Sequence, residues 1–290
     1  MSKWLGLRLR FHPLFVVFML VSVLTGFFVE MITLFGIVFI HELGHVTVAK
    51  GFGWKIKEIQ FLPFGGVAVT EQAENVPAYE EMMVALAGPA QNALMIGVAM
   101  VMREFNVSEA AWWQYFMSAN LMIGLFNLLP VLPLDGGKIL QALISYWLSY
   151  HQVMVGVTTI SLLFSAVMVL VSFLSFNSAG IQLNLLVIGM YLFLSNWQDY
   201  RNIPFRHIRF LMGRQNRFVH WIRRGTLAQP IVVHRQRKIG DVLRMFKREK
   251  YHLIYVLNER GAIQTVFPEQ KMIDAYLGQK PGTSVSDLFM

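Results

Sequence analysis

Long apolar runs separated by short polar stretches dominate the first 200 residues. A helix that crosses a membrane needs about 20 consecutive apolar residues, and about six runs approach that length. They lie at residues 13–29, 31–49, 82–102, 112–130, 155–175 and 181–198. The pattern predicts a polytopic all-α membrane bundle of about six transmembrane helices.

A shorter segment between the second and third runs has a different period. Residues 54–61 alternate polar and apolar side chains, as a β-strand does. Residues 67–70 form a second candidate strand after a turn. We therefore expect a small β element close to the membrane surface. It is either plain scaffold or, through the strand at 57–62, an edge to which an unwound substrate adds.

The composition changes after Trp197. Residues 201–224 carry seven arginines interleaved with aromatic side chains, and the patterns beyond 226 predict a small α/β domain. The expected domains are a membrane domain (1–200), a basic amphipathic linker (201–225) and a cytoplasmic domain (226–290). The linker favours a helix among anionic lipid headgroups. Docking to an acidic partner ranks second, and nucleic-acid binding ranks lowest because the linker joins a span directly.

Composition and charge fit this reading. Of the 290 residues, 55% are hydrophobic and 14% are charged, values typical of a membrane protein rather than a soluble domain. Lys and Arg collect on the cytoplasmic side of membranes, which is the first interpretation of the net charge of +8. The basic N-terminal flank predicts a cytoplasmic N-terminus, and an even number of crossings returns the C-terminus to the same side. The first run is then an uncleaved signal anchor. With no cysteine, disulfides, thiolate metal sites and cysteine nucleophiles are excluded.

The second apolar run contains the sequence His-Glu-Leu-Gly-His at residues 41–45. Side chains four residues apart lie on one face of a helix, so His41 and His45 can present two imidazoles to one metal ion, with Glu42 beside it as a general base. Ionisable side chains are costly inside a membrane and indicate function there. The motif therefore predicts a metal site rather than a chance cluster.

A catalytic zinc ion has three protein ligands and one open position. Asp135 is the remaining acidic candidate at the depth of the histidines, because Glu104 and Glu109 fall on the opposite side and Asp199 ends the last span. Two prolines before Asp135 prevent regular helix, and two glycines after it permit a sharp turn. The alternative for this carboxylate is a helix N-cap.

The motif suggests a division of roles around one Zn²⁺ ion. His41, His45 and Asp135 would bind it, and Glu42 would move a proton from water to the leaving amine. Asn127 is a candidate substrate-binding residue, with an interhelical hydrogen bond as the equal alternative. Phe64, Gly65 and Gly66 are candidates for a flexible cover that contacts substrate.

Three segments together resemble a known family. They are the HELGH motif in a membrane helix, residues 87–92 (AGPAQN), and residues 127–137 (NLLPVLPLDGG). This combination resembles the site-2 proteases, which are intramembrane zinc metalloendopeptidases. The resemblance implies that the family's metal ligands match His41, His45 and Asp135, and that its catalytic glutamate matches Glu42.

Residues 226–290 resemble a single CBS module, a feature of one sporulation group within that family. This resemblance implies several further properties. The substrate would be a membrane-tethered precursor like pro-sigma-K, and the location the mother-cell membrane around the forespore. Inhibitory membrane partners would resemble stage IV sporulation protein FA and BofA, with a homo-oligomer as a further possibility and no nucleic acid. ATP would bind the module, although residues 261–270 lack the aspartate of its Thr/Ser-x-x-Asp signature.

Two other functional classes compete with proteolysis. One is a catalytically silent metal-binding protein, or a transporter regulated by the CBS-like domain; the other is a scaffold. Transport needs charges spread along a path through the bilayer, whereas here they cluster at one depth, which favours hydrolysis. A scaffold has no need of Glu42.

Overall fold

The computed structural model describes residues 3–4, 7–11, 19, 21–62, 65–70, 76–105, 109–174, 182–278 and 283–289. Its internal contacts divide the chain into two compact units, residues 1–140 and 141–290. Each unit is described by itself. Within the first expected span, residues 13–29, positions 13–18 and 20 lie outside the described residues.

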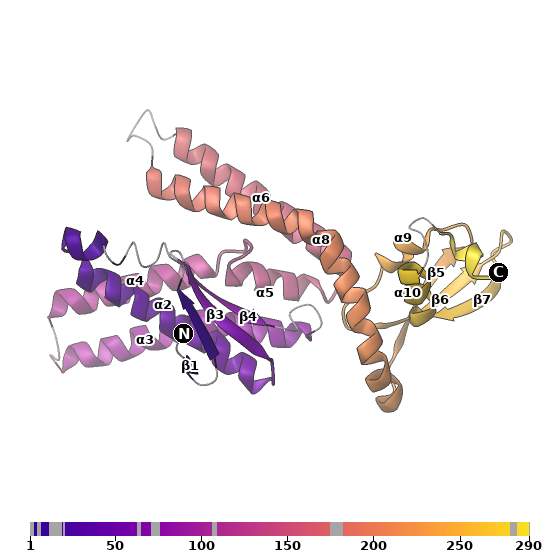
Figure 1. Cartoon of the computed structure of the whole chain (residues 1–290), viewed down its shortest axis with the longest axis horizontal. Coiled ribbons are helices and arrows are strands. Elements are labelled where there is room, and N and C mark those ends of the chain that lie inside the picture. Colours follow the sequence, from indigo (N-terminus) through magenta and orange to yellow (C-terminus); the bar gives the residue numbers. More distant parts are fainter. Residues whose placement is uncertain are drawn as a thin grey trace. The chain divides into compact units, whose positions relative to one another are not determined.

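Three helices form the body of the first unit (Figure 1). Helix α3 (Ala78–Glu104) packs against α2 (Phe28–Gly51) and against α4 (Ala110–Asn127). The close approach of α2 and α3 requires glycine at position 44, because a Cβ on Gly44 would lie 2.7 Å from the carbonyl oxygen of Ala87. So short a distance between a side chain and the neighbouring backbone would push the two helices apart.

A four-stranded sheet completes this unit. The strands are β1 (Lys3–Trp4), β2 (Leu7–Phe11), β3 (Ile56–Leu62) and β4 (Gly65–Thr70), in the spatial order β1-β2-β3-β4. The hairpin of β3 and β4 was predicted, but β1 and β2 were not, because β2 pairs in parallel with a strand far along the chain. The expectation that residues 57–62 form an open edge is wrong. Strand β3 is paired on both sides, and β4 is an edge of the described sheet.

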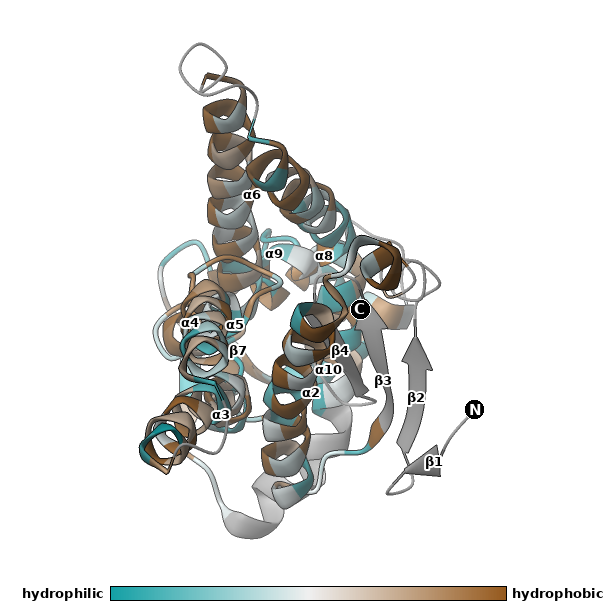
Figure 2. Cartoon of the chain, turned by 90° about the vertical axis from the view of Figure 1, so that its left-hand side faces the viewer, coloured by the Kyte–Doolittle hydropathy of each residue, from teal (hydrophilic) through white to brown (hydrophobic). Residues whose placement is uncertain are grey.

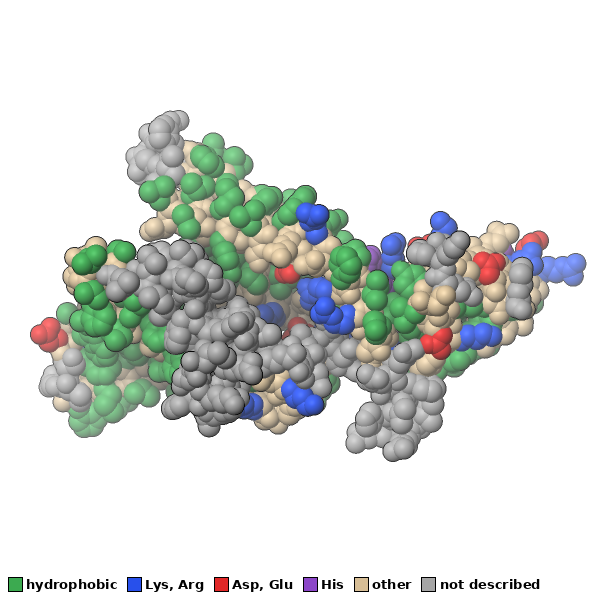
Figure 3. Space-filling view, viewed as in Figure 1, with side chains coloured by type: hydrophobic (Ala, Val, Ile, Leu, Met, Phe, Trp, Pro, Cys, Tyr) green, Lys and Arg blue, Asp and Glu red, His purple; other side chains and the backbone are tan. Residues whose placement is uncertain are grey.

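Two long helices dominate the second unit. Helix α6 (Tyr150–Leu174) packs along α8 (Leu183–Arg224), and the rings of Tyr150 and Phe210 stack with centroids 4.0 Å apart. Figure 3 shows hydrophobic side chains along this helical pair. The segment that we expected to be a linker, 201–225, belongs almost wholly to α8, which continues through it without a break.

Three described helices, α2, α3 and α6, are long and apolar enough to cross a membrane, and Figure 2 shows their largely hydrophobic ribbons. The expected fourth span corresponds to α4, which mixes polar and aromatic residues with apolar ones. The expected sixth span is the apolar first part of α8. The total of six crossings stays a prediction.

The chain ends in a small α/β domain, as predicted. Its elements are β5 (Ala228–His234), α9 (Ile239–Leu243), β6 (Tyr251–Leu257), β7 (Ile263–Pro268), α10 (Glu269–Gly278) and the 3₁₀ helix η1 (Val285–Phe289). Strand β6 is central, parallel to β5 and antiparallel to β7. Alternate β6 side chains are buried, including Ile254 and Val256, so one face of the sheet forms the core of the domain.

A buried ion pair joins α8 to this domain. Arg214 of α8 is 1% exposed and donates to both carboxylate oxygens of Glu269, at 3.1 and 2.7 Å. It also donates to the carbonyls of Lys247 and Lys250. Burial raises the pKa of Glu269, but the hydrogen bond from His252 and the charge of Arg214 outweigh it and hold that pKa below its ordinary value. The sequence pattern had assigned Arg214 to a lipid-facing linker.

Loop 128–134 and helix α5 (Asp135–Ile144) follow α4. Gly136 and Gly137 were expected to permit a sharp turn, but both lie in the first turn of α5, and neither is among the described glycines with positive φ. Glycine is required at both positions because the backbone of the preceding loop leaves no room for a side chain. A Cβ on Gly136 would lie 2.2 Å from the carbonyl oxygen of Leu128, and one on Gly137 would lie 2.5 Å from the carbonyl carbon of Val131.

Candidate metal centre

Helix α2 places the two motif histidines side by side. His41 is 3% exposed and His45 is 7% exposed, and their Nε2 atoms lie 3.1 Å apart. Glu42 is also buried, and it offers a carboxylate oxygen within 4.8 Å of the histidine nitrogens. The one-turn spacing thus brings two imidazoles and one carboxylate to a single buried place.

Asp135 reaches the same place from the start of α5. Its Oδ2 lies 3.1 Å from Nε2 of His41 and 3.1 Å from Nε2 of His45. Its Oδ1 lies 3.2 Å from Nζ of Lys138. Asp135 is the first residue of α5, and both of its oxygens are engaged by these side chains rather than by a helix cap.

The three donor atoms form a triangle with sides of 3.1 Å. Zinc bonds to nitrogen and oxygen are about 2.0–2.1 Å long, so two ligands of a tetrahedral zinc ion lie about 3.3 Å apart. The observed triangle is therefore close to one face of a zinc tetrahedron. Two neutral imidazole nitrogens and one carboxylate oxygen are also a common ligand set of catalytic zinc ions.

Gly88 of α3 provides room next to these atoms. A Cβ at this position would lie 2.4 Å from Nε2 of His45 and 2.5 Å from Nε2 of His41. An ion held by both nitrogens needs that space. The residues that converge here fit a zinc ion in both donor chemistry and volume.

The second nitrogen of each imidazole also has a partner. Nδ1 of His45 lies 2.7 Å from the carbonyl oxygen of Val84, and Nδ1 of His41 lies 2.5 Å from Oδ1 of Asn92. Both partners are on α3. Such outer contacts hold the ring of a metal ligand in place and select its tautomer.

Sequence reasoning missed these supporting residues. Gly88 and Asn92 lie within the AGPAQN segment, but the motif alone did not indicate what they contact. One signal was present, since the two are four residues apart and share one face of α3. Val84 and Lys138 carried no such signal.

The candidate substrate residues are more scattered. Asn127 ends α4 and donates its amide to the carbonyl of Ile123, 3.0 Å away, which engages its donor within its own helix. Gly65 and Gly66 begin β4 and pair with Leu62 and Phe61. Phe64 lies outside the described residues.

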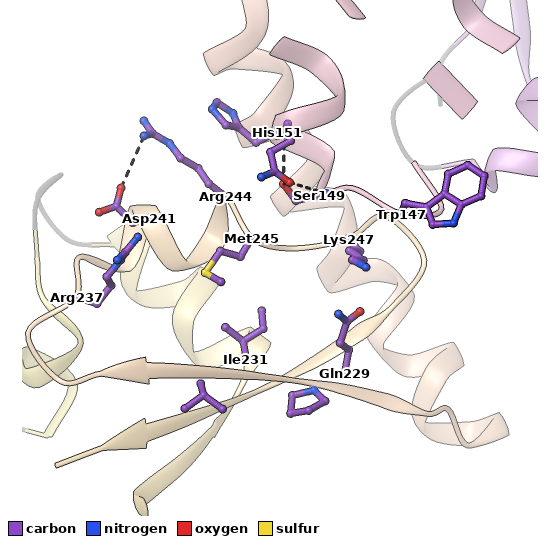
Figure 4. Close-up of a pocket in the computed structure, with 13 residues that line it drawn as sticks. Trp147, Ser149, His151, Gln229, Ile231, Arg237, Asp241, Arg244, Met245 and Lys247 are labelled. Carbon is purple, nitrogen blue, oxygen red and sulfur yellow. Dashed lines mark hydrogen bonds and ion pairs between the residues drawn. The ribbon is translucent and has the colours of Figure 1, made fainter. Parts of the chain in front are cut away.

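The second unit contains a separate cleft of about 520 Å³ between the start of α6 and the C-terminal domain. Arg237, Arg244 and Lys247 contribute positive charge to its lining, and Asp241 contributes one negative charge. Figure 4 shows these side chains around the cleft, with Arg244 paired to Asp241. Its net charge suits an anion.

The family model for peptidase family M50 matches residues 29–108 and 95–172 of this chain. Stage IV sporulation protein FB of Bacillus subtilis is 32% identical over 293 aligned positions, covering 100% of this chain and 99% of that protein. A zinc metalloprotease of Methanocaldococcus jannaschii is 33% identical over 64% of this chain and 57% of its own length. A putative zinc metalloprotease of Mycobacterium tuberculosis, Rip3, is 26% identical over 86% of this chain and 63% of its own.

A solved structure is also similar. The site-2 protease from Methanocaldococcus jannaschii aligns with a TM-score of 0.57 at 29% sequence identity. The alignment covers 69% of this chain and 94% of that chain.

Proposed function

The chain belongs to peptidase family M50, the site-2 proteases, and is an integral membrane zinc metalloprotease; from this premise we propose its substrate and the roles of its residues. Its substrate is a membrane-associated precursor, a pro-sigma factor like pro-sigma-K, cut near the cytoplasmic leaflet during sporulation. The resemblance to a sporulation protein along the whole chain supports this substrate class.

We assign the zinc ligands to His41, His45 and Asp135. The observation that carries this proposal is the buried triangle of their donor atoms, each 3.1 Å from the other two. Zinc bound there would supply Lewis-acid chemistry, lowering the pKa of a water molecule and polarising the scissile carbonyl.

Glu42 is the general base and then the general acid. Its carboxylate lies beside the ligand triangle, where it would reach a water molecule bound at the site. It accepts a proton from that water as the water attacks the carbonyl, and donates it to the nitrogen of the departing peptide. Lys138, paired to Oδ1 of Asp135, keeps the other carboxylate oxygen turned towards the two histidines.

The test is coexpression with a membrane-tethered pro-sigma precursor. Glu42→Gln should abolish cleavage while the purified protein retains zinc. Glu30→Gln, at the other end of α2, is the matched control and should cleave like wild type. Proteolysis by the Glu42→Gln protein would refute the assigned role.

We further propose that the unwound substrate adds as a strand to β4. This edge is unpaired in the described sheet, and strand addition satisfies the backbone groups of an extended peptide. Asn127, Phe64, Gly65 and Gly66 would then contact the substrate near the site. Proline at Ala68 of β4 removes a backbone donor and should weaken cleavage without lowering zinc content. Undiminished cleavage would eliminate this binding mode.

The orientation proposed is both termini in the cytoplasm, in the mother-cell membrane. Because the chain has no cysteine, single cysteines placed in predicted loops can be labelled from one side at a time. Labelling of the C-terminal domain from outside intact cells would contradict this orientation.

The same resemblance supports inhibition by membrane partners like stage IV sporulation protein FA and BofA. Coexpression of such partners should then stop cleavage.

A regulatory role for the C-terminal domain is the second proposal. We propose that it is a CBS-like module and that ATP binds in the basic cleft of Figure 4. The positive charges of Arg237 and Lys247 support an anionic ligand. Binding of a fluorescent ATP analogue to the whole protein should weaken in Lys247→Gln but not in Lys271→Gln, since Lys271 lies on α10 over the Phe267 ring. No binding at millimolar analogue would refute it.

A further inference from the structure

We propose that Asn92 and Asn120 position His41 for the metal through a directed chain of hydrogen bonds that starts at a backbone carbonyl of α4. This inference rests on the proposed role of His41 as a zinc ligand. It adds two positioning residues, neither of which touches the metal or the substrate.

The chain crosses three helices. Asn120 of α4 donates its amide to the carbonyl of Phe116, 2.9 Å away in the same helix. Asn92 of α3 donates to Oδ1 of Asn120 at 3.1 Å. Oδ1 of Asn92 then lies 2.5 Å from Nδ1 of His41 on α2.

Each link determines the direction of the next. A backbone carbonyl can only accept a hydrogen bond, so it binds the NH₂ end of Asn120 and turns the oxygen of Asn120 towards Asn92. That oxygen binds the NH₂ end of Asn92 and turns the oxygen of Asn92 towards His41. An acceptor at Nδ1 requires the His41 tautomer with hydrogen on Nδ1. Nε2 is then unprotonated and can bind a metal.

The two histidines are therefore supported in different ways. His45 donates to the carbonyl of Val84, which is part of the backbone and cannot reverse. His41 depends on an amide that could rotate by 180° and present a donor instead. Asn120 and the Phe116 carbonyl prevent that rotation.

Burial makes the chain costly to leave incomplete. Asn92 is 2% exposed and Asn120 is 0% exposed, and a buried polar group left without a hydrogen-bond partner destabilises the fold. Gly124 of α4 eases the close approach of Asn92, because a Cβ there would lie 3.3 Å from Cβ of Asn92. A simple interhelical bond would stabilise the bundle equally well in either amide orientation; the directed chain predicts an effect on metal affinity.

The experiment measures zinc affinity by chelator competition in a Glu42→Gln background, so that the readout does not depend on proteolysis. Asn92→Leu should lower zinc affinity about 10–100-fold, the usual effect of losing such a partner. Asn92→Asp retains an acceptor for His41 and should stay within about threefold of the parent. The matched control is Asn196→Leu, which removes a buried asparagine that also bonds the carbonyl four residues earlier; it should leave zinc affinity unchanged.

Asn120 supplies the sharper test. Asn120→Leu should lower zinc affinity although Asn120 does not contact His41, and the double variant with Asn92→Leu should be no worse than Asn92→Leu alone. Additive losses would overturn the chain, because residues that act through one another are not independent. Equal affinity in Asn92→Leu and Asn92→Asp would overturn it too. If the Glu42→Gln parent itself binds no zinc, the proposed metal site fails instead.

Discussion

A methyl group at Gly88 should remove the metal from this enzyme. The position is on α3, far in sequence from the HELGH motif, and it lies directly against the two histidine nitrogens. The change Gly88→Ala adds one carbon and no charge. It should also favour helix by about 1 kcal/mol, so that a loss of function cannot be attributed to a weaker helix.

The magnitude follows from the geometry. The added carbon would lie 2.4 Å from Nε2 of His45 and 2.5 Å from Nε2 of His41, whereas non-bonded atoms pack at about 3.5 Å. The overlap is thus about 1 Å, and a zinc site tolerates about 0.2 Å. The rings cannot swing aside without losing the contacts to Asn92 and Val84. We expect at least about a 100-fold loss of zinc affinity, or about 3 kcal/mol.

The assay is zinc per protein, with cleavage of a tethered precursor measured in parallel. Gly97→Ala is the matched control because it lies in the same helix and a Cβ there has nothing within 4 Å. The control should bind zinc and cleave like wild type. Stoichiometric zinc and undiminished cleavage in Gly88→Ala would refute the assigned metal position.

Three other outcomes are expected. Asp135→Ala should lose zinc and cleavage together, whereas a helix-cap role would lower only stability; metal analysis of the purified protein distinguishes the two. Arg214→Met leaves Glu269 buried without its cationic partner and should cost the C-terminal domain about 3–5 kcal/mol, seen as easier proteolysis of that domain, while Arg201→Met should not. Equal resistance to proteolysis would contradict a stabilising role for this buried ion pair. Acidification should also loosen the domain. Burial lowers the pKa of His252, so the fold holds it neutral, and stability is lost as pH falls below about 6.5, the ordinary histidine value; a His252→Gln variant should flatten this part of the thermal-stability profile.

The sequence alone predicted those structural features whose signal lies within a short stretch of the chain. The spacing of His41 and His45 needs only the helical period, and apolar runs predicted α2, α3 and α6 because a span must be continuous in sequence. Elimination proposed Asp135 as the third ligand, since few acidic residues were available at that depth, and the structure places its carboxylate beside both histidines. The hairpin of β3 and β4 followed from short-range alternation.

Other features depend on pairings between distant segments. The N-terminal strands are short, and they are strands only because β2 pairs with β3 and β1 pairs with β2. Arg214 looked like one of several basic residues in a lipid-facing stretch, and its burial depends on how α8 meets the domain that follows. The two glycines after Asp135 were recognised for the wrong reason, because their role is close packing against the preceding loop.

By itself, the sequence determined the type of chemistry and the candidate residues for it, since metal ligands must be particular side chains at particular spacings. The tertiary structure alone decided how those side chains are held. Gly88 leaves space for an ion, Val84 and Asn92 orient the imidazoles, and Asn120 directs Asn92. These contacts join three helices, and such distances between helices are set by packing rather than by any local pattern.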